Sequence, residues 1–153
     1  LRILDKLAVK TGGGENHRIG LYDMVMIKDN HITVAGSITE AVKLVRNTKN
    51  NLPVEVEVKN FTELEEALEL KVERIMLDNM SIEQMAKAVL ITNNRVPLEA
   101  SGNITIDNVA EVAGTGVNYI STGQLTHSVK AMDISLLITP ASGPLKFPPE
   151  IIA

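Results

Sequence analysis

Short apolar runs alternate along this chain with stretches in which apolar residues recur every three or four positions. Residues 24–27 form a continuous apolar run, which is the pattern of a strand buried on both faces. Further strand candidates follow in VEVEV, IMLDN, PLEASG and NYISTG. Between VEVEV and IMLDN, the spacing of Leu64, Ala67 and Leu68 places them on one side of a helix. This alternation predicts an α/β protein built on a parallel sheet or barrel.

Three of the predicted helices begin with the spacing of a capping box. In this motif a Ser or Thr hydroxyl accepts a backbone N–H bond, and an acid or amide three residues later bonds back. The pairs are Ser37 with Glu40, Thr62 with Glu65, and Ser81 with Gln84. Further helices are expected over residues 1–10 and near 105–113, and a strand or helix is expected over 133–138.

The pattern divides the chain into a β/α-barrel domain over residues 1–138 and a Pro-rich extended tail over 139–153. The first predicted helix has no strand before it, although each barrel unit begins with a strand. We therefore expect the chain to be the C-terminal piece of a longer protein. A sheet that lacks its first strand exposes an unpaired edge, so we also expect marginal stability of the chain alone or a partner beside it.

Polar residues follow the apolar runs at the points where the strands end. They are Lys28, Glu57, Asp78, Ser101, Gly102 and Gly123. The carboxyl ends of parallel strands meet at one rim of a β/α barrel, and active sites of such barrels lie there. These residues are therefore expected to converge on one site.

Two carboxylates of VEVEV are expected to point into the barrel. Strand alternation puts Glu55 and Glu57 on one face, and a buried charge without a partner costs several kcal/mol. With Asp78 from the next unit, Glu57 would form a carboxylate pair suited to Mg²⁺ or to sugar hydroxyls. The alternative is structural: the acids lie on an exposed edge strand, or they pair with lysines.

Other residues at the expected rim favour an anionic ligand. Arg18, beside His17, offers the fork geometry that binds a carboxylate through two hydrogen bonds, although an Arg after a glycine triplet is also common on a solvated surface. The segment 101–103 precedes a helix start near Thr105, where backbone N–H groups could bind an anion. His31 and His127 are expected to be surface or packing residues.

Composition excludes several classes of function. The net charge of −4, the two Tyr, the two Phe and the absence of Trp argue against nucleic-acid binding. The chain has no Cys, which excludes disulfides and a thiolate nucleophile. No apolar run approaches the length of a membrane span. We expect a cytoplasmic protein, or a plastid one if a transit peptide lies upstream of Leu1.

Five blocks of the sequence resemble the quinolinate phosphoribosyltransferase family, the carboxylating nicotinate-nucleotide pyrophosphorylases. They are GGGENHRIGLYDMVMIKDNHI, PVEVEV, IMLDNM, LEASGNIT and ISTGQLTHS, in this order and at these intervals. The resemblance covers residues 1–138 and implies an open, TIM-like β/α barrel of about six strands, the first of which is missing from this chain. It also implies transfer of phosphoribosyl from 5-phosphoribosyl 1-diphosphate to quinolinate in NAD biosynthesis, which yields nicotinate mononucleotide, pyrophosphate and carbon dioxide.

The resemblance also implies roles for individual residues. His17 and Arg18 would hold the quinolinate carboxylates, and Lys28 would lie between substrate and diphosphate. Glu57 and Asp78 would hold the ribose hydroxyls and the diphosphate with its Mg²⁺. The 5-phosphate would be bound by Ser101, Gly102, Asn103 and Gly123. A homodimer or a dimer-based oligomer is expected.

The chain departs from the family in four ways: at Asn103, at Gln124 in place of a usual small apolar residue, in its Pro-rich end, and in what would precede Leu1. Asn103 stands where many members have Gly, and we expect the loop to survive because Asn tolerates left-handed backbone. The family's N-terminal sandwich domain, its first barrel strand and a Thr-Arg-Lys-Thr motif would precede Leu1, so full activity is expected only of the whole protein. Two other readings stay open: a non-catalytic barrel fragment, and a nicotinate phosphoribosyltransferase-like enzyme that recognises one carboxylate.

Overall fold

A computed structural model of the chain describes residues 1–48 and 51–138. Five parallel strands form one sheet in the order β1-β2-β3-β4-β5. They are β1 (Val25–Ile27), β2 (Val54–Val58), β3 (Arg74–Asp78), β4 (Leu98–Ser101) and β5 (Tyr119–Ile120). The helices are α1 (Arg2–Thr11), α2 (Asp29–Ala35), α3 (Ile38–Asn47), α4 (Phe61–Glu69), α5 (Ile82–Thr92), α6 (Val109–Gly114) and the short 3₁₀ helix η1 (Gly123–Leu125).

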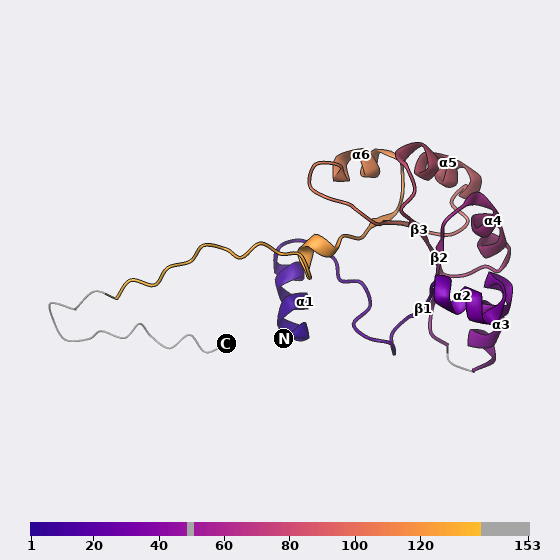
Figure 1. Cartoon of the computed structure of the whole chain (residues 1–153), viewed down its shortest axis with the longest axis horizontal. Coiled ribbons are helices and arrows are strands. Elements are labelled where there is room, and N and C mark those ends of the chain that lie inside the picture. The colour runs from indigo at the N-terminus through magenta and orange to yellow at the C-terminus, as the bar shows by residue number, and fades with distance from the viewer. Residues whose placement is uncertain (49–50, 139–153) are drawn as a thin grey trace.

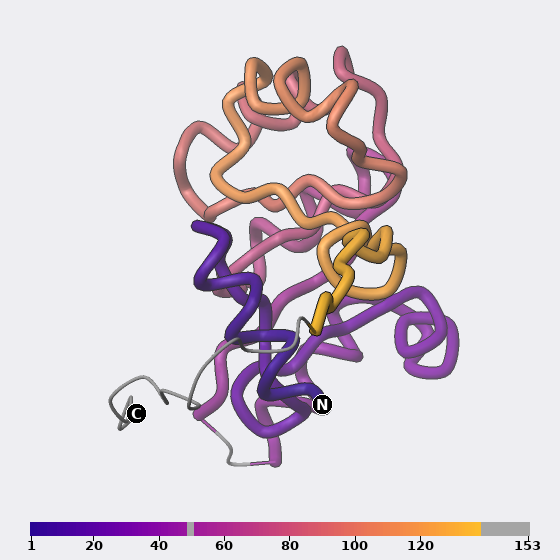
Figure 2. Tube along the Cα trace, turned by 90° about the vertical axis from the view of Figure 1, so that its left-hand side faces the viewer, coloured from indigo at the N-terminus to yellow at the C-terminus, as the bar shows by residue number. Residues whose placement is uncertain are grey.

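The sheet is curved, and its two sides are covered differently. Helices α2 to α6 lie along the outer side, whereas α1 lies on the open side (Figure 1). Viewed toward that open side, α1 and the segment around η1 lie side by side in front of the sheet (Figure 2). Within the described ranges each edge strand, β1 and β5, pairs with one neighbour, so the α/β sheet is open as expected.

The register between strands decides which residues share the open side. Glu55 pairs with Arg74, and Met76 pairs with Glu99. Directly paired residues of parallel strands point to the same side of the sheet, and side chains alternate along each strand. A row of mostly polar residues therefore faces the open side. Glu57, two residues after Glu55, faces the same way, which confirms the expectation for these two acids.

The outer side of the sheet forms the core with the helices. Val56, Ile75 and Leu77 are completely buried there. They belong to one apolar cluster with Leu64 of α4 and Val42 of α3. The strands thus place apolar residues under the helices and leave the polar ones for the open side.

Replacing Ile75 by Ala is expected to lower the free energy of unfolding by about 2 to 5 kcal/mol, because it leaves a cavity in the centre of this core. Urea unfolding followed by circular dichroism measures the loss. Leu90→Ala is the control, since Leu90 is 79% exposed on α5. An equal loss in the two variants would contradict the assignment of the core.

Of the three expected capping boxes, that at Ser81 is complete and that at Ser37 is half formed. The Ser37 hydroxyl accepts the N–H of Glu40 at 3.1 Å. The Ser81 hydroxyl accepts the N–H of Gln84 at 3.3 Å, and the Gln84 side chain accepts the N–H of Ser81 in return.

The cap predicted at Thr62 is wrong. Helix α4 begins at Phe61, and its cap is Asn60, whose side-chain oxygen accepts the N–H of Glu63 at 3.0 Å. Asn is as good an N-cap as Ser or Thr, and here it comes first along the chain.

Two further segments differ from the expectation. Helix α2 was not expected: it starts directly after Lys28 and ends at Gly36, whose φ of +95° suits glycine. Residues 133–138 form neither strand nor helix and are exposed. The proposed tail, 139–153, lies outside the described residues. No helix in the described part of the chain is long and apolar enough to cross a membrane.

Candidate functional site

The best-defined contact at the carboxyl ends of the strands joins Lys28 and Glu57. The Lys28 Nζ lies 2.9 Å from Glu57 Oε2. Glu57 is 9% exposed, whereas the Lys28 side chain is about half exposed. The structural alternative is therefore correct in one respect, since Glu57 does pair with a lysine. That lysine is itself one of the residues that the sequence placed at the rim.

Asp78 ends the neighbouring strand on the same side of the sheet. Its Oδ1 accepts a hydrogen bond from Asn79 Nδ2 at 2.7 Å. Asn79 has a left-handed backbone with φ +52°, and its N–H donates to the Ser101 carbonyl at 2.9 Å. The register pairs Asp78 with Ser101, so the carboxylate lies beside the next loop. Sequence reasoning missed Asn79, the residue that links the two.

A second ion pair at this end of the sheet was also missed. Lys59 Nζ lies 2.9 Å from Asp29 Oδ2. The hydrogen bond to Asp29 raises the pKa of Lys59, and the charges of Asp78 and Glu57 act in the same direction. The same bond lowers the pKa of Asp29. Lys59 follows β2 directly, and it adds a cation close to the two rim carboxylates.

A polar cavity of about 630 Å³ lies between the ends of β4 and β5. Its lining includes all four residues expected to bind a phosphate, which are Ser101, Gly102, Asn103 and Gly123. Asn103 has a φ of +54°, so it adopts the left-handed backbone expected of it. His127, expected at the surface, is exposed but also lines this cavity. His31 is exposed and accepts the N–H of Lys28, which is a structural role.

The helix expected to start near Thr105 begins later, at Val109. The Thr105 N–H donates to the side chain of Asn108 at 2.8 Å and is therefore not available to an anion. An Asn three residues on forms a turn that competes with the helix start. The predicted anion site thus keeps its loop residues but loses the helix N-terminus.

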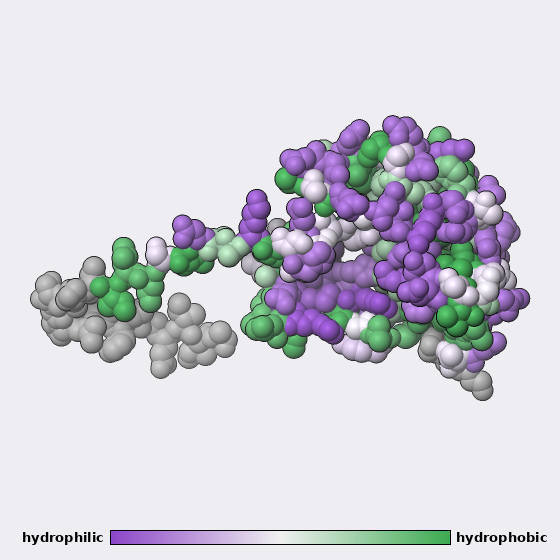
Figure 3. Space-filling model, viewed as in Figure 1, coloured by the Kyte–Doolittle hydropathy of each residue, from purple (hydrophilic) through white to green (hydrophobic). Residues whose placement is uncertain are grey.

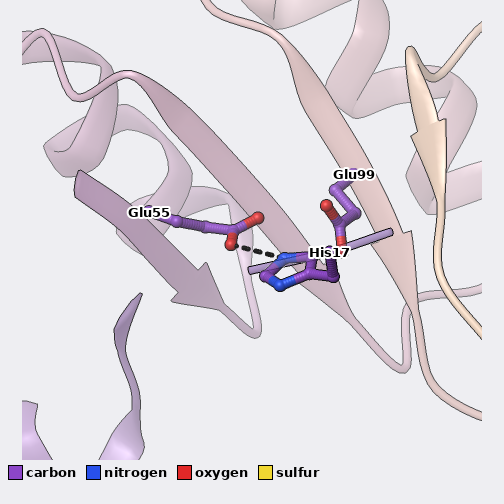
Figure 4. A group of neighbouring side chains, drawn as sticks. All are labelled: His17, Glu55 and Glu99. Carbon is purple, nitrogen blue, oxygen red and sulfur yellow. Dashed lines mark hydrogen bonds and ion pairs between the residues drawn. The ribbon is translucent and has the colours of Figure 1, made fainter. Parts of the chain in front are cut away.

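A loop from the other end of the chain covers the middle of the open side. His17 Nε2 lies 2.9 Å from Glu55 Oε2 and 3.5 Å from Glu99 Oε1. Figure 4 shows the three side chains together. Glu99 also accepts hydrogen bonds from Arg74 at 2.9 Å and from Ser121 at 2.7 Å. Both glutamates are almost completely buried.

The electrostatics of this cluster follow from its geometry. The hydrogen bond to Glu55, then that to Glu99, raises the pKa of His17 to about 9, although burial opposes the rise. Burial by itself raises the pKa of Glu99, but hydrogen bonds from His17, Ser121 and Arg74 outweigh it and hold this pKa well below its usual range. His17 is therefore protonated and Glu99 is charged at neutral pH.

Helix α1 holds this loop in place. Lys6 Nζ donates to the carbonyls of His17 and Arg18, at 3.1 and 2.9 Å. The half-buried Arg18 donates through Nη1 to the Met24 carbonyl at 3.2 Å. Figure 3 shows polar side chains around the hollow between α1 and the sheet, with apolar ones at the N-terminal end of α1. His17 and Arg18 therefore lie on the open side, as the site requires.

The chain is similar to known proteins along most of its described length. A model of the family "Quinolinate phosphoribosyl transferase, C-terminal domain" matches residues 1–137. A carboxylating nicotinate-nucleotide pyrophosphorylase of rice, named as chloroplastic, is 53% identical over 90% of this chain and 42% of its own length. A decarboxylating quinolinate phosphoribosyltransferase of tobacco, named as mitochondrial, is 48% identical over 90% of this chain and 45% of its own length.

Solved structures give the same result. NadC from Streptococcus pyogenes matches with a TM-score of 0.82 and 43% identity, over 87% of this chain and 47% of that one. The nicotinate-nucleotide pyrophosphorylase from Francisella tularensis matches with a TM-score of 0.83 and 47% identity, over 88% and 48%. The chain spans about half the length of the curated relatives that it matches. It belongs to the quinolinate phosphoribosyltransferase family, in which it corresponds to the C-terminal domain.

Proposed function

We propose that the protein carrying this chain is a quinolinate phosphoribosyltransferase. It would transfer phosphoribosyl from 5-phosphoribosyl 1-diphosphate to quinolinate and release pyrophosphate and carbon dioxide, leaving nicotinate mononucleotide for NAD synthesis. The observation that carries the proposal is the open side of the sheet. There the Lys28–Glu57 pair, Asp78 and the polar cavity follow neighbouring strand ends, and the loop of His17 and Arg18 lies over the same face.

The loop supplies the groups that a dicarboxylate needs. Protonated His17 and the guanidinium of Arg18 are adjacent, and both offer N–H donors to carboxylate oxygens. His17 lies beside the buried Glu55 and Glu99, and Arg18 donates to the Met24 carbonyl next to it in the same loop. We assign quinolinate binding to these two residues.

The rim carboxylates suit the reacting sugar. Departure of pyrophosphate leaves positive charge at the anomeric carbon of the ribose, and Glu57 and Asp78 would offset that charge from fixed positions. Lys28 would stabilise the leaving diphosphate, because its half-exposed ammonium can reach an anion while it stays beside Glu57. Once the pyridine nitrogen carries the ribose, its positive charge can accept the electron pair left by carbon dioxide.

The polar cavity is assigned to the 5-phosphate. Ser101 and the backbone of Gly102, Asn103 and Gly123 line it, and short backbone approach is possible because two of the four residues lack a side chain. An added Cβ at Gly123 would lie 2.0 Å from the His127 ring, so the cavity wall is closely packed at that point.

The donor set also fits Mg²⁺, which prefers oxygen ligands. Lys28 contacts one oxygen of Glu57, and Asn79 contacts one oxygen of Asp78. Among the described residues no hydrogen bond reaches the second oxygen of either carboxylate. Glu57 and Asp78 would therefore hold the ion, directly or through water or the diphosphate. When bound, it would neutralise charge on the leaving diphosphate.

One assay separates this proposal from its alternatives. The whole protein is incubated with 5-phosphoribosyl 1-diphosphate and either quinolinate or nicotinate, and nicotinate mononucleotide is measured by chromatography. We expect product from quinolinate, with little competition from nicotinate. Product from nicotinate would favour a nicotinate phosphoribosyltransferase-like enzyme, and product from neither would favour a non-catalytic fragment.

Arg18→Lys is expected to raise the KM for quinolinate about tenfold or more, because a point charge replaces the guanidinium fork. The KM for 5-phosphoribosyl 1-diphosphate should change little. Steady-state kinetics of the whole protein measure both constants. Arg46→Lys, on the exposed surface of α3, is the matched control. Equal changes in the two KM values would contradict a role of Arg18 in binding quinolinate.

Assembly and compartment belong to the same proposal. Ile3, Leu4 and Leu7 of α1 are exposed, and an apolar patch of this kind favours a protein contact, for which we propose the homodimer. Sedimentation velocity of the whole protein tests it.

Because the relatives include proteins named as chloroplastic and mitochondrial, the proposed compartment is the cytoplasm or an organelle, and a fluorescent fusion of the whole gene product distinguishes the two.

A further inference from the structure

We propose that Glu55 and Glu99 are positioning residues that keep His17 doubly protonated, with its Nε2–H turned to the sheet and its Nδ1–H turned to a substrate carboxylate. This inference rests on the proposed function, since it names how the site recognises one carboxylate of quinolinate. Neither glutamate belongs to the set of residues expected to touch substrate.

The contacts fix the direction of the ring. Nε2 faces Glu55 at 2.9 Å and Glu99 at 3.5 Å, and Figure 4 shows the ring between the two strands that carry them. Among the described residues no hydrogen bond reaches Nδ1 of His17. Nδ1 is thus the ring nitrogen that a ligand on the open side can meet.

The protonation state decides what Nδ1 can do. In a neutral imidazole whose Nε2–H donates to a glutamate, Nδ1 carries a lone pair and would repel a carboxylate. In the imidazolium form both nitrogens donate. Binding an anion at Nδ1 therefore requires the second proton, and the cluster must retain that proton at neutral pH.

The charges of the cluster favour that proton. Glu55 and Glu99 face His17 from β2 and β4, and the Arg74 guanidinium of β3 contacts Glu99 at 2.9 Å. Without a charge on His17, one carboxylate would stay uncompensated in a buried position, which is costly. Glu55 is 0% exposed, and its Oε1 has no hydrogen-bond partner. The rise of the His17 pKa to about 9 agrees with this balance.

The same three residues could also be regarded as metal ligands. Their ligand atoms lie within 4.8 Å of one another. A cation there would have to displace the Nε2 proton of His17 and would lie near the Arg74 guanidinium, which already occupies Glu99. A proton satisfies the cluster without either cost. The titration of His17 described next is therefore also carried out with Zn²⁺ added.

The first test is a pH titration of His17 in the whole protein. It is monitored by NMR of labelled histidine, in a variant in which His31→Gln and His127→Gln remove the other two histidines of this chain. We expect a midpoint near pH 9. Glu55→Gln should lower it by about one unit or more. Glu40→Gln should leave it unchanged, because Glu40 pairs with Lys43 on the surface. A midpoint near 6.5 while Glu55 and Glu99 are intact would overturn the proposal, and so would displacement of the His17 signal by micromolar Zn²⁺ alone.

The second test is the pH dependence of quinolinate binding. The KM should stay low while His17 is charged and rise as the pH passes about 9. In the folded Glu55→Gln variant that rise should begin at lower pH, and between the two midpoints the KM for quinolinate should increase about tenfold. The KM for 5-phosphoribosyl 1-diphosphate should change little. A merely structural Glu55 would change both constants together.

The outcomes separate the two levels of the argument. If the unmutated protein turns over no quinolinate, the proposed function fails, whatever the histidine titration shows. If it does turn over quinolinate but the KM and its pH break are the same in Glu55→Gln, the positioning role alone is overturned. The titration with Glu55 and Glu99 intact does not depend on whether the Glu55→Gln variant folds, so the proposal stays open to contradiction.

Discussion

Replacing Glu57 by Gln is expected to lower the turnover of the whole protein about a hundredfold or more, because a transition-state charge loses its fixed counter-charge. The side chain keeps its size and its reach to Lys28, so folding should change little. The Lys28 side chain is about half exposed and can be solvated when its partner becomes neutral. Turnover of quinolinate and thermal melting are measured side by side.

The control for Glu57 is Glu40→Gln, which removes a carboxylate from another lysine pair. Glu40 lies 2.8 Å from Lys43, with both side chains exposed on α3. It should affect neither turnover nor melting. A Glu57→Gln protein that makes nicotinate mononucleotide at the unmutated rate would mean that the Lys28–Glu57 pair is structural, and the mechanism proposed for the rim would be wrong.

The sequence was sufficient to place the rim residues because strand geometry is rigid. The period of two in VEVEV determines that Glu55 and Glu57 share a face, and parallel strands determine that their ends meet. The same period puts Glu99 two residues before Ser101 on the same face. The pattern therefore contained Glu99 as well, but strand ends alone gave no reason to select it.

The partners of these acids could not be read from the sequence. His17 reaches Glu55 and Glu99 only because an irregular loop folds back across the sheet, held by Lys6 of α1. Neither the path of a glycine-rich loop nor the register between strands follows from local propensity. Two predicted helix starts were wrong because more than one nearby residue could form the cap. Asn60 rather than Thr62 caps α4, and the Asn108 side chain binds the Thr105 N–H, so that α6 starts later.

Gly102→Ala is expected to raise the KM for 5-phosphoribosyl 1-diphosphate by about tenfold or more and to lower the melting temperature by several degrees, since strained backbone and a steric clash each cost about 1 to 3 kcal/mol. Gly102 has a φ of +97°, and an added Cβ would lie 2.3 Å from Asn79 Oδ1. The KM for quinolinate should change much less. Steady-state kinetics and thermal melting measure these effects.

The reason for a combined effect is that Asn79 connects two parts of the site. Its Nδ2 donates to Asp78, and its Oδ1 accepts from Asn103, so a methyl group that pushes it would disturb a rim carboxylate and the phosphate loop together. Gly36→Ala separates strain from contact. Gly36 has nearly the same φ, +95°, but nothing lies within 4 Å of its added Cβ. This control should lose stability and keep both KM values. If Gly36→Ala and Gly102→Ala changed the kinetics equally, the link from Gly102 through Asn79 to Asp78 would be refuted.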